Sequence, residues 1–458
     1  MKKLSIALLL LALNVAAYSQ TKVPEMPIFE RTLSNGLKVV TVQDRSNPVV
    51  TVQVWYRVGG KDDPEGKSGF AHMFEHMMFK ATKNMPNETM DRLTEDVGGW
   101  NNASTREDLT NYYEEIPSNY LETLLWAEAE RMVNLAVDEG NFASERDVVK
   151  EEYRQGVLAN PYGMFFQYLD SLTFKKHPYK RGVIGNLDEL NAASLEDAFA
   201  FYREYYRPDN ASLIIVGDFD RYQLDKWIDK YFGSIKNPEG EIRRVSVVEP
   251  DKTEEERYDR FRPNVPECCP ALGITYLAPP SDSDDVPALE ILQAILSGGE
   301  SSRLYQSLIY KKQIAQDVGF FADIRTEKGL LIFYSIAASG KTTLEMEKAI
   351  DEEIAKLREE APSAIEVEKA KNVLITRILR ERETVNGKAV ALGEAIIYKG
   401  DPKAANKEVS RLQSVTPADI KRIVNKYMGG KNRVVINYRN GEEDAEANVA
   451  ASDEGGSK

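Results

Sequence analysis

The sequence predicts an α+β protein made of two duplicated halves, each a mostly antiparallel sheet with helices packed on one face. Three observations lead to this prediction. The chain has 458 residues, which is enough for two domains with separate hydrophobic cores. Short strands followed by amphipathic helices occur in both halves. A series of helix-cap, helix and strand signals also recurs at a fixed offset.

The recurrence is clearest near the end of each half, where four polar and aromatic positions repeat without a gap. Ser194, Asp197, Tyr205 and Asn210 match Thr416, Asp419, Tyr427 and Asn432, each 222 positions further on. The strand segments at 52–56 and 272–276 also resemble each other, and a helix is expected after each. We interpret this pattern as an internal duplication, whose two halves could close on each other like a clamshell.

Residues 1–19 are typical of a secretory signal peptide, because Lys2 and Lys3 precede an apolar stretch and Ala17–Ser19 offers a small-residue cleavage site. The alternative is a retained N-terminal anchor, although the apolar run is short for a membrane span. We therefore expect a periplasmic or secreted protein with no membrane span in the mature chain. The formal net charge of −14 gives no reason to expect nucleic-acid binding.

Composition suggests the remaining boundaries. Residues 20–30 are expected to form a leader, residues 31–235 the first domain and residues 261–438 the second. The segment 236–260 is rich in Lys, Glu, Pro and Asp and predicts a linker. Residues 439–458 are acidic and rich in Gly, Ser and Ala, which predicts a disordered tail.

The chain has only two cysteines, Cys268 and Cys269, and they are neighbours. Adjacent cysteines rarely bridge one another because the geometry is strained. We expect small buried strand residues, with no disulfide framework and no cysteine-type zinc site.

Turn signals and periodicity divide the first half into short elements. In order, we expect a hairpin over 31–44, a strand over 49–58, helices over 69–79 and 86–97, paired strands over 101–108 and 109–116, helices over 117–133, 144–154, 162–175 and 194–206, a strand over 211–216 and a helix over 220–232. Within this set, Ser144 is expected near the N-cap of its helix.

Two of the three histidines lie four residues apart, at His72 and His76, with Glu75 between them. On a helix these three side chains share one face, so both imidazoles could reach one metal ion. The pair could equally be packed core histidines, but a glutamate among apolar neighbours is costly to bury without a partner. The third histidine, His177, is isolated before a proline, and we expect it to be a loop residue.

A carboxylate from the predicted helix over 144–154 could complete the metal site. Glu145, Val148, Val149 and Glu152 fall on one side of this helix. The segment alone is equally compatible with a solvated charged helix. If it pairs with the histidine helix, it completes a His, His, Glu set, which is a known catalytic zinc arrangement. Periodicity favours Glu152 over Glu151, which would point about 100° away.

With these motifs in place, the chain resembles the insulinase/pitrilysin family of zinc peptidases, the inverzincins, which include mitochondrial processing peptidase and its bacterial relatives. The resemblance covers nearly all of residues 30–438. It rests on His72-Met-Phe-Glu75-His76, Glu145-Arg146 with Glu152, Gly98-Gly99-Trp-Asn-Asn102-Ala103-Ser104-Thr105, Thr110-Asn-Tyr112 and His177-Pro-Tyr.

The resemblance implies a role for each polar residue of the candidate site. His72, His76 and Glu152 are implied as ligands of one Zn²⁺ per chain, and Glu75 as the general base. Glu145 is implied to orient one of the zinc ligands without binding the metal itself. The second half has an apolar segment, 291–296, where the first has its histidines, so only one copy would bind metal.

In this family, the strand after the glycine pair is a sheet edge that binds the substrate backbone. Here that strand corresponds to Asn102, Ala103, Ser104 and Thr105. Such β-augmentation reads the main chain more than the side chains.

The sequence departs from the family in the second half. The family's Arg and Tyr, which help to bind substrate and stabilise the oxyanion, fall on Ile309 and Gln316. Arg303 and Tyr310 share the spacing of seven, but Arg303 belongs to a turn with its own packing role. We expect a catalytic subunit of a heterodimer, with a homologous partner supplying Arg and Tyr; a homodimer is the other possibility.

The sequence therefore favours a zinc endopeptidase acting on peptides or unfolded polypeptide segments. The alternative is a non-catalytic scaffold or peptide-binding subunit of a larger complex. The complete set of His72, Glu75, His76 and Glu152 argues against a scaffold, which need not retain Glu75.

Overall fold

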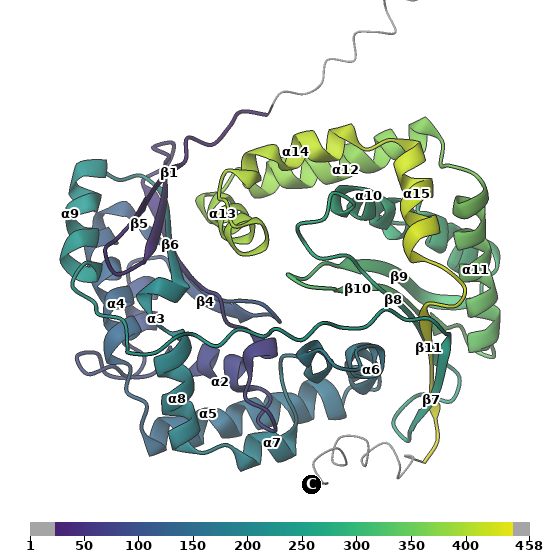
Figure 1. The fold of residues 1–458 in the computed structure, drawn as a ribbon, viewed down its shortest axis with the longest axis horizontal. Coiled ribbons are helices and arrows are strands. Elements are labelled where there is room, and N and C mark those ends of the chain that lie inside the picture. The colour runs from purple at the N-terminus through teal and green to yellow at the C-terminus, as the bar shows by residue number, and fades with distance from the viewer. Residues whose placement is uncertain (1–22, 443–458) are drawn as a thin grey trace, which may run out of the picture.

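The computed structural model describes residues 23–442, which form two halves, each built on its own sheet (Figure 1). The expected signal peptide at 1–19 lies outside the described residues, as does most of the expected tail. Within the described range, the α+β architecture with two mostly antiparallel sheets is confirmed.

The first sheet has six strands in the order β1-β2-β6-β3-β5-β4. Its strands are β1 Phe29–Thr32, β2 Lys38–Gln43, β3 Val49–Tyr56, β4 Trp100–Thr105, β5 Thr110–Pro117 and β6 Ala211–Gly217. All neighbours pair antiparallel except β2 and β6. The predicted hairpin and the predicted paired strands are present as β1-β2 and β4-β5. Strand β4 is at the edge of the sheet.

Seven helices of the first half pack around the core on one face of this sheet. They are α2 Phe70–Met77, α3 Thr89–Glu95, α4 Leu121–Asn134, α5 Glu139–Glu152, α7 Leu187–Ala192, α8 Leu195–Tyr205 and α9 Arg221–Phe232. A π-helical segment, Tyr153–Leu158, continues α5 and leads to α6, Gly163–Thr173.

The second sheet has five strands in the order β7-β11-β8-β10-β9. Its strands are β7 Glu256–Arg262, β8 Ala271–Leu277, β9 Ala315–Asp323, β10 Leu330–Ala337 and β11 Arg433–Asn440. The helices of this half are α10 Val286–Ser297, α11 Thr343–Glu359, α12 Ala364–Glu381, α13 Val385–Lys399, α14 Ala404–Ser414 and α15 Pro417–Tyr427, with a π-helical turn at Tyr305–Lys311.

The predicted duplication is visible in caps and in strand register. Ser194 and Thr416 both cap their helices through a capping box closed by an aspartate three residues on. The strands that follow these helices also match. Ile215 of β6 pairs with Val52 of β3, and Asn437 of β11 pairs with Leu272 of β8. The two partners, 215 and 437, are again 222 positions apart, so the copies share one sheet topology.

The two halves exchange one helix each. Helix α13 of the second half packs on β3 and β6 of the first sheet, and α6 of the first half packs on β8 and β11 of the second. Glycines allow the close approach, because a Cβ at Gly393 would lie 2.1 Å from the Trp55 ring and one at Gly273 would lie 2.6 Å from Leu169. Each sheet therefore has one face covered by a helix from the other half, and the two halves share buried surface.

Three boundary predictions were wrong. The expected linker over 236–260 already contains the start of β7, which pairs in parallel with β11 and so belongs to the second sheet. The expected tail from residue 439 begins inside β11, which ends at Asn440. The helix expected from Ser144 begins at Glu139, because Asp138 caps it by accepting a hydrogen bond from the Asn141 N–H at 2.9 Å.

The expectation that the two cysteines are unbridged strand residues was also wrong. Cys268 and Cys269 are joined in a disulfide between neighbours. They lie in the connection between β7 and β8 and not in a strand, with Cys268 exposed and Cys269 buried. A turn gives adjacent cysteines a freedom that a pleated strand, with side chains on opposite faces, does not.

Candidate metal centre

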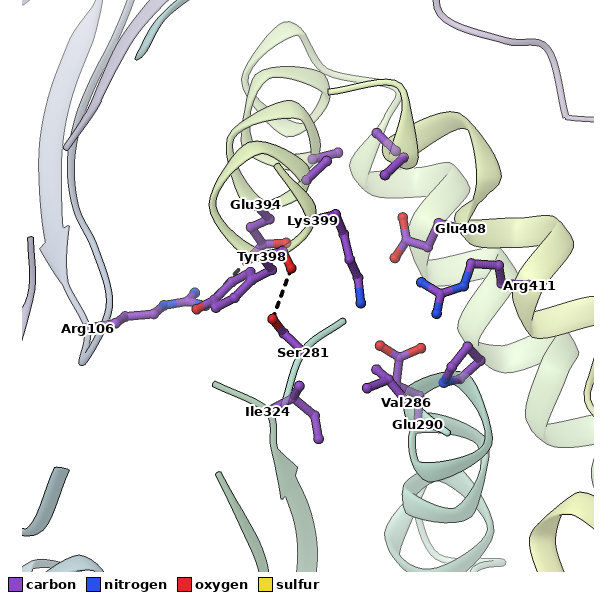
Figure 2. A pocket seen from close by; sticks show the side chains of 15 residues that line it. Arg106, Ser281, Val286, Glu290, Ile324, Glu394, Tyr398, Lys399, Glu408 and Arg411 are labelled. Carbon is purple, nitrogen blue, oxygen red and sulfur yellow. Dashed lines mark hydrogen bonds and ion pairs between the residues drawn. The ribbon is translucent and has the colours of Figure 1, made fainter. Parts of the chain in front are cut away.

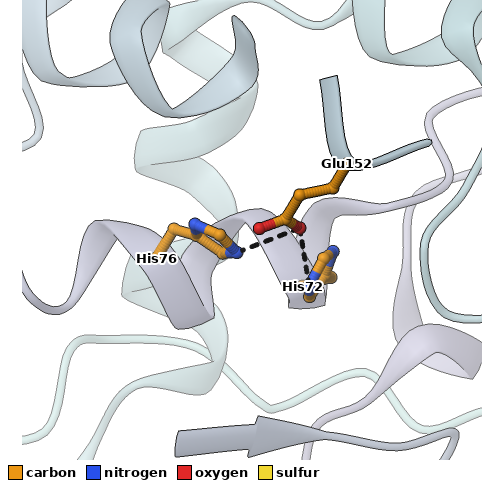
Figure 3. Close-up of side chains that lie close together, drawn as sticks. All are labelled: His72, His76 and Glu152. Atoms are coloured by element: carbon orange, nitrogen blue, oxygen red, sulfur yellow. Dashed lines mark ion pairs between the residues drawn. The ribbon is translucent and has the colours of Figure 1, made fainter. Parts of the chain in front are cut away.

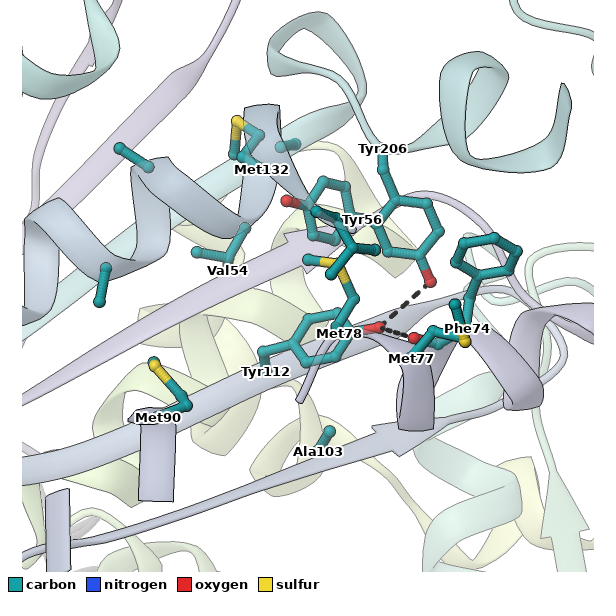
Figure 4. Packing of buried hydrophobic residues seen from close by; sticks show 14 of the residues in the cluster. Val54, Tyr56, Phe74, Met77, Met78, Met90, Ala103, Tyr112, Met132 and Tyr206 are labelled. Atoms are coloured by element: carbon teal, nitrogen blue, oxygen red, sulfur yellow. Dashed lines mark hydrogen bonds between the residues drawn. The ribbon is translucent and has the colours of Figure 1, made fainter. Parts of the chain in front are cut away.

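Helix α2 presents the histidine motif on its polar side. Its opposite side buries Phe70, Met73, Phe74 and Met77 in the hydrophobic core of the first half. Figure 4 shows Phe74 and Met77 in this core. The Tyr112 hydroxyl donates to the Phe74 carbonyl oxygen at 3.2 Å, which ties the helix to β5. The remaining polar face holds both histidines and Glu75, each only partly exposed.

The start of α2 is held by a carboxylate from the preceding loop. Asp63 accepts hydrogen bonds from the backbone N–H groups of Gly69 at 2.6 Å and Ala71 at 2.8 Å. Burial raises the pKa of Asp63 to about 7, although these N–H groups and Arg181 act in the opposite direction. Gly69 takes φ 92°, and a Cβ there would lie 2.8 Å from the Ile184 carbonyl oxygen, so the helix start requires glycine.

Helix α5 brings two carboxylates to the histidines (Figure 3). A Glu152 oxygen lies 3.7 Å from His72 Nε2 and 3.5 Å from His76 Nε2. One donor atom from each of the three residues lies within 4.8 Å of the others. The neighbouring Glu151 instead bonds Gln155 and Arg154 at the surface. The geometry therefore brings together the three residues that the sequence analysis had implied as ligands.

Glu145, also on α5, lies on the side of the His76 ring away from Glu152. Its carboxylate is 3.7 Å from His76 Nδ1 and 2.8 Å from Lys80 Nζ, and its side chain is only 5% exposed. Burial raises the pKa of Glu145, but hydrogen bonds from His76 and Lys80 outweigh it, so the pKa lies below its ordinary value. Glu145 is thus an ionised group on the far side of the His76 ring.

The pKa values of the two imidazoles are shifted in opposite directions. Burial, helped by the nearby His76, lowers the pKa of His72 to about 4. His72 Nδ1 is buried and has no hydrogen-bond partner among residues 23–442. Burial also lowers the pKa of His76, but Glu145 and Glu152 raise it more. A buried neutral imidazole next to a carboxylate suits a divalent metal, which needs unprotonated donors.

Glu75 connects the helix to the edge strand β4. Burial raises the pKa of Glu75 above its ordinary value, against hydrogen bonds from the hydroxyl and backbone N–H of Thr105. Along β4, Asn102 is exposed and Ala103 is buried, while the Ser104 hydroxyl donates to Asn111 at 2.7 Å. The predicted substrate strand is therefore an edge strand that touches the candidate base.

Three other residues considered in the sequence, His177, Arg303 and Tyr310, lie outside this cluster. His177 is 1% exposed; its Nδ1 accepts from the Tyr179 N–H at 3.2 Å and its Nε2 lies 3.2 Å from Glu327, as a loop histidine does. Arg303 forms two 2.7 Å hydrogen bonds with Glu366, and Tyr310 is 68% exposed. Arg303 is therefore paired with Glu366, which belongs to the same half of the chain.

Asp63 and Lys80 support the site without having been predicted from the sequence. Lys80 lies in the turn after α2, which ends at Met77, so helical spacing does not place it. Asp63 is six residues from Gly69, outside any local capping pattern, and only the folded loop shows its role. Within residues 23–442, no helix is long and apolar enough to cross a membrane.

The fold and the cluster define a two-domain α+β protein with a His, His, Glu centre of the type found in metallopeptidases. Residues 38–186 match the family described as insulinase (peptidase family M16), and residues 192–374 match the peptidase M16 inactive domain. The chain belongs to this insulinase family of peptidases.

Relatives agree with this assignment. The zinc protease PqqE of Helicobacter pylori is 32% identical over 385 residues, covering 84% of this chain and 83% of that protein. The mitochondrial-processing peptidase subunit beta of Lentinula edodes is 25% identical and covers 89% of each chain.

Solved structures show the same fold. A protease from Helicobacter pylori superposes with a TM-score of 0.87 at 27% identity, covering 90% of this chain and 100% of that one. The first half of the periplasmic protease PqqL from Escherichia coli has a TM-score of 0.73 at 17% identity, covering 95% of this chain and 98% of that one.

Proposed function

We propose that the protein is a zinc-dependent endopeptidase that hydrolyses peptides or unfolded polypeptide segments. The observation that carries the proposal is the meeting of three donor atoms within 4.8 Å from helices far apart in sequence. His72 and His76 come from α2 and Glu152 from the end of α5. Zinc proteases among the relatives support the choice of metal.

Each residue of the site has a distinct part in this proposal. His72, His76 and Glu152 hold one zinc ion, and Glu145 orients His76. When bound, zinc supplies Lewis-acid activation of water and of the scissile carbonyl. Glu75 takes the proton of the attacking water and passes it to the leaving amine. Burial keeps the pKa of Glu75 above its ordinary value, which suits proton exchange.

Strand β4 binds the substrate backbone. Its position at the sheet edge leaves backbone groups free to pair with an extended peptide. Asn102, Ala103, Ser104 and Thr105 form this strand beside Glu75, so a peptide added here would lie next to the base. Recognition through the main chain fits a substrate in an unfolded conformation.

A homologous partner completes the site. The second half packs Ile309 against its core and leaves Gln316 exposed on β9, and Arg303 is held by Glu366. We therefore propose a heterodimer in which a related subunit supplies Arg and Tyr, as the subunit name of one relative supports. Peptide cleavage at full rate by the purified chain alone would contradict this part. The signal-peptide pattern of residues 1–19 supports export to the periplasm or the exterior.

The test is Glu75→Gln in the full chain with its partner. We expect peptide hydrolysis to fall about 10²–10⁴-fold, while zinc stoichiometry stays at one per chain. Glu95→Gln, an exposed change on α3, is the matched control and should cleave normally. If Glu75→Gln cleaves as well as the parent, Glu75 is not the base. If the parent neither binds zinc nor cleaves peptides, the scaffold alternative holds.

A further inference from the structure

A cavity of about 230 Å³ lies away from the metal centre, where the two halves meet (Figure 2). Its walls come from α10, α13 and α14 of the second half and from Arg106 of the first. Arg106 directly follows Thr105 of β4, and α13 is the helix that packs on the first sheet. The cavity therefore touches elements that join the halves.

Most of the charged groups around this cavity already have partners. Glu394 accepts from Arg106 at 3.4 Å, Glu408 accepts from Arg382 at 2.5 Å, and Arg411 donates to a backbone carbonyl oxygen at 3.4 Å. These groups hold the walls together.

Two opposite charges, Lys399 and Glu290, attract each other across the cavity, but among residues 23–442 they form no hydrogen bond or ion pair; burial lowers the pKa of Lys399, and Glu290 acts in the opposite direction. The Lys399 ammonium is buried and has no hydrogen-bond partner among residues 23–442. The Glu290 carboxylate likewise has no hydrogen bond or ion pair within that range; burial raises its pKa to about 7, and neighbouring charges add smaller effects. Figure 2 shows Lys399 and Glu290 reaching into the cavity from opposite walls. Leaving the Lys399 ammonium buried without a hydrogen-bond partner is unfavourable.

The two charges call for a ligand that carries both a carboxylate and an ammonium group. Aliphatic side chains, among them Val286, Ile324 and Ala391, line much of the rest of the wall. The volume is below the roughly 300–1,000 Å³ of pockets for larger ligands. We propose that this cavity binds a free α-amino acid with an aliphatic side chain, its carboxylate on Lys399 and its ammonium on Glu290.

A bound amino acid would add contacts between α10 and α13, and α13 carries the first sheet. Occupancy should therefore stabilise the association of the halves. This inference does not depend on the proposed peptidase activity, because none of its residues belongs to the metal centre.

The first experiment compares three molecules of one shape on the full chain at about pH 8, where Glu290 is ionised. L-Leucine has both charges, isocaproate lacks the ammonium group, and isoamylamine lacks the carboxylate. We expect calorimetry to show leucine binding and each analogue binding about tenfold more weakly or worse, because a charge-assisted hydrogen bond is lost. Leucine should also raise the melting temperature.

The second experiment uses variants. Lys399→Met and Glu290→Gln should each weaken leucine binding about tenfold or more. Lys407→Met, an exposed change on α14, is the matched control and should bind normally. No leucine binding at millimolar concentration would mean that the cavity holds water only. Isocaproate binding as tightly as leucine would reduce the site to an anion site. Unchanged affinity in Lys399→Met would place leucine elsewhere. Each of these three results overturns the proposal.

Discussion

Replacing Glu145 by glutamine tests whether a buried carboxylate orients a metal ligand. The Glu145 carboxylate lies 3.7 Å from His76 Nδ1, on the side of the ring away from Glu152. Glutamine keeps the shape and removes the charge. It also leaves Lys80 without its ion pair, but Lys80 is 31% exposed and water can solvate it. The main effect should therefore fall on His76.

The magnitude follows from distance and burial. At an effective dielectric constant of about 20, two unit charges 3.7 Å apart interact by roughly 4–5 kcal/mol. A neutral imidazole N–H carries only part of a unit charge, so the loss should be smaller, about 1.5–3 kcal/mol. This corresponds to zinc binding that is about 10–100-fold weaker, the usual effect of removing a group that supports a ligand.

The assay is competition for zinc with a fluorescent chelator at neutral pH. Glu151→Gln is the matched control, because Glu151 is on the same helix but bonds Gln155 and Arg154 at the surface. The control should bind zinc like the parent, and the metal-free melting temperature of Glu145→Gln should change little. A zinc affinity for Glu145→Gln within about twofold of the parent would refute an orienting role.

Three further predictions concern the ligand set and the stability of the second half. Glu152→Gln should lose zinc, and unchanged metal stoichiometry would move the third ligand to another carboxylate, with Glu151 the first to test. Asp285 is buried, which raises its pKa, but hydrogen bonds from Lys426, Tyr427 and Arg422 lower it overall from 3.8 to about 2. Asp285→Asn should therefore lower the free energy of unfolding by about 2 kcal/mol at pH 7. Because the folded pKa is depressed, that difference should shrink as the pH falls from about 4 towards 2 in urea titrations, and a constant difference would be contrary evidence. Gln313 is exposed with φ 52°, so Gln313→Gly should raise the unfolding free energy by about 0.5–1 kcal/mol; a loss of stability would show that its side chain matters more than its backbone.

The duplication could be predicted from sequence because its signals are local. A capping box needs only a hydroxyl residue and a carboxylate three positions on, and Ser194 and Thr416 both have one. The asparagine before each strand repeats as well, with Asn210 and Asn432 donating to the carbonyl oxygens of Tyr205 and Tyr427. These contacts lie within a few residues, so spacing alone reveals them.

The exchange of helices could not be predicted in this way. The apolar stripes of α6 and α13 indicate helices, but a stripe does not say which sheet it will cover. The choice depends on close approaches such as Gly393 against Trp55, between residues more than 300 positions apart. The linker prediction failed for a related reason, because charged β7 is a strand only through its pairing with β11.

In the candidate site, the positions of His72, Glu75 and His76 on one face followed from helical spacing, and Glu152 followed from the periodicity of α5. The supporting contacts were harder to predict. Asp63 holds the start of α2 from a loop, and Thr105 bonds Glu75 from a strand 30 positions on. Both depend on tertiary structure, and neither residue belongs to a recognisable metal pattern.

The two copies differ in a way that would confine the proposed metal chemistry to the first half. In both halves a short helix packs against a longer one, α2 against α5 and α10 against α12. In the second half the pair is closed by apolar residues such as Ile291 and Leu292 of α10 and Leu374 of α12, all in one core. That contact is stable without any ligand. In the first half the corresponding contact brings together two partly buried imidazoles, the buried Glu145 and the exposed Glu152, so polar groups stand where the second half has an apolar contact. The same architecture thus forms a closed apolar contact in one copy and the proposed metal site in the other.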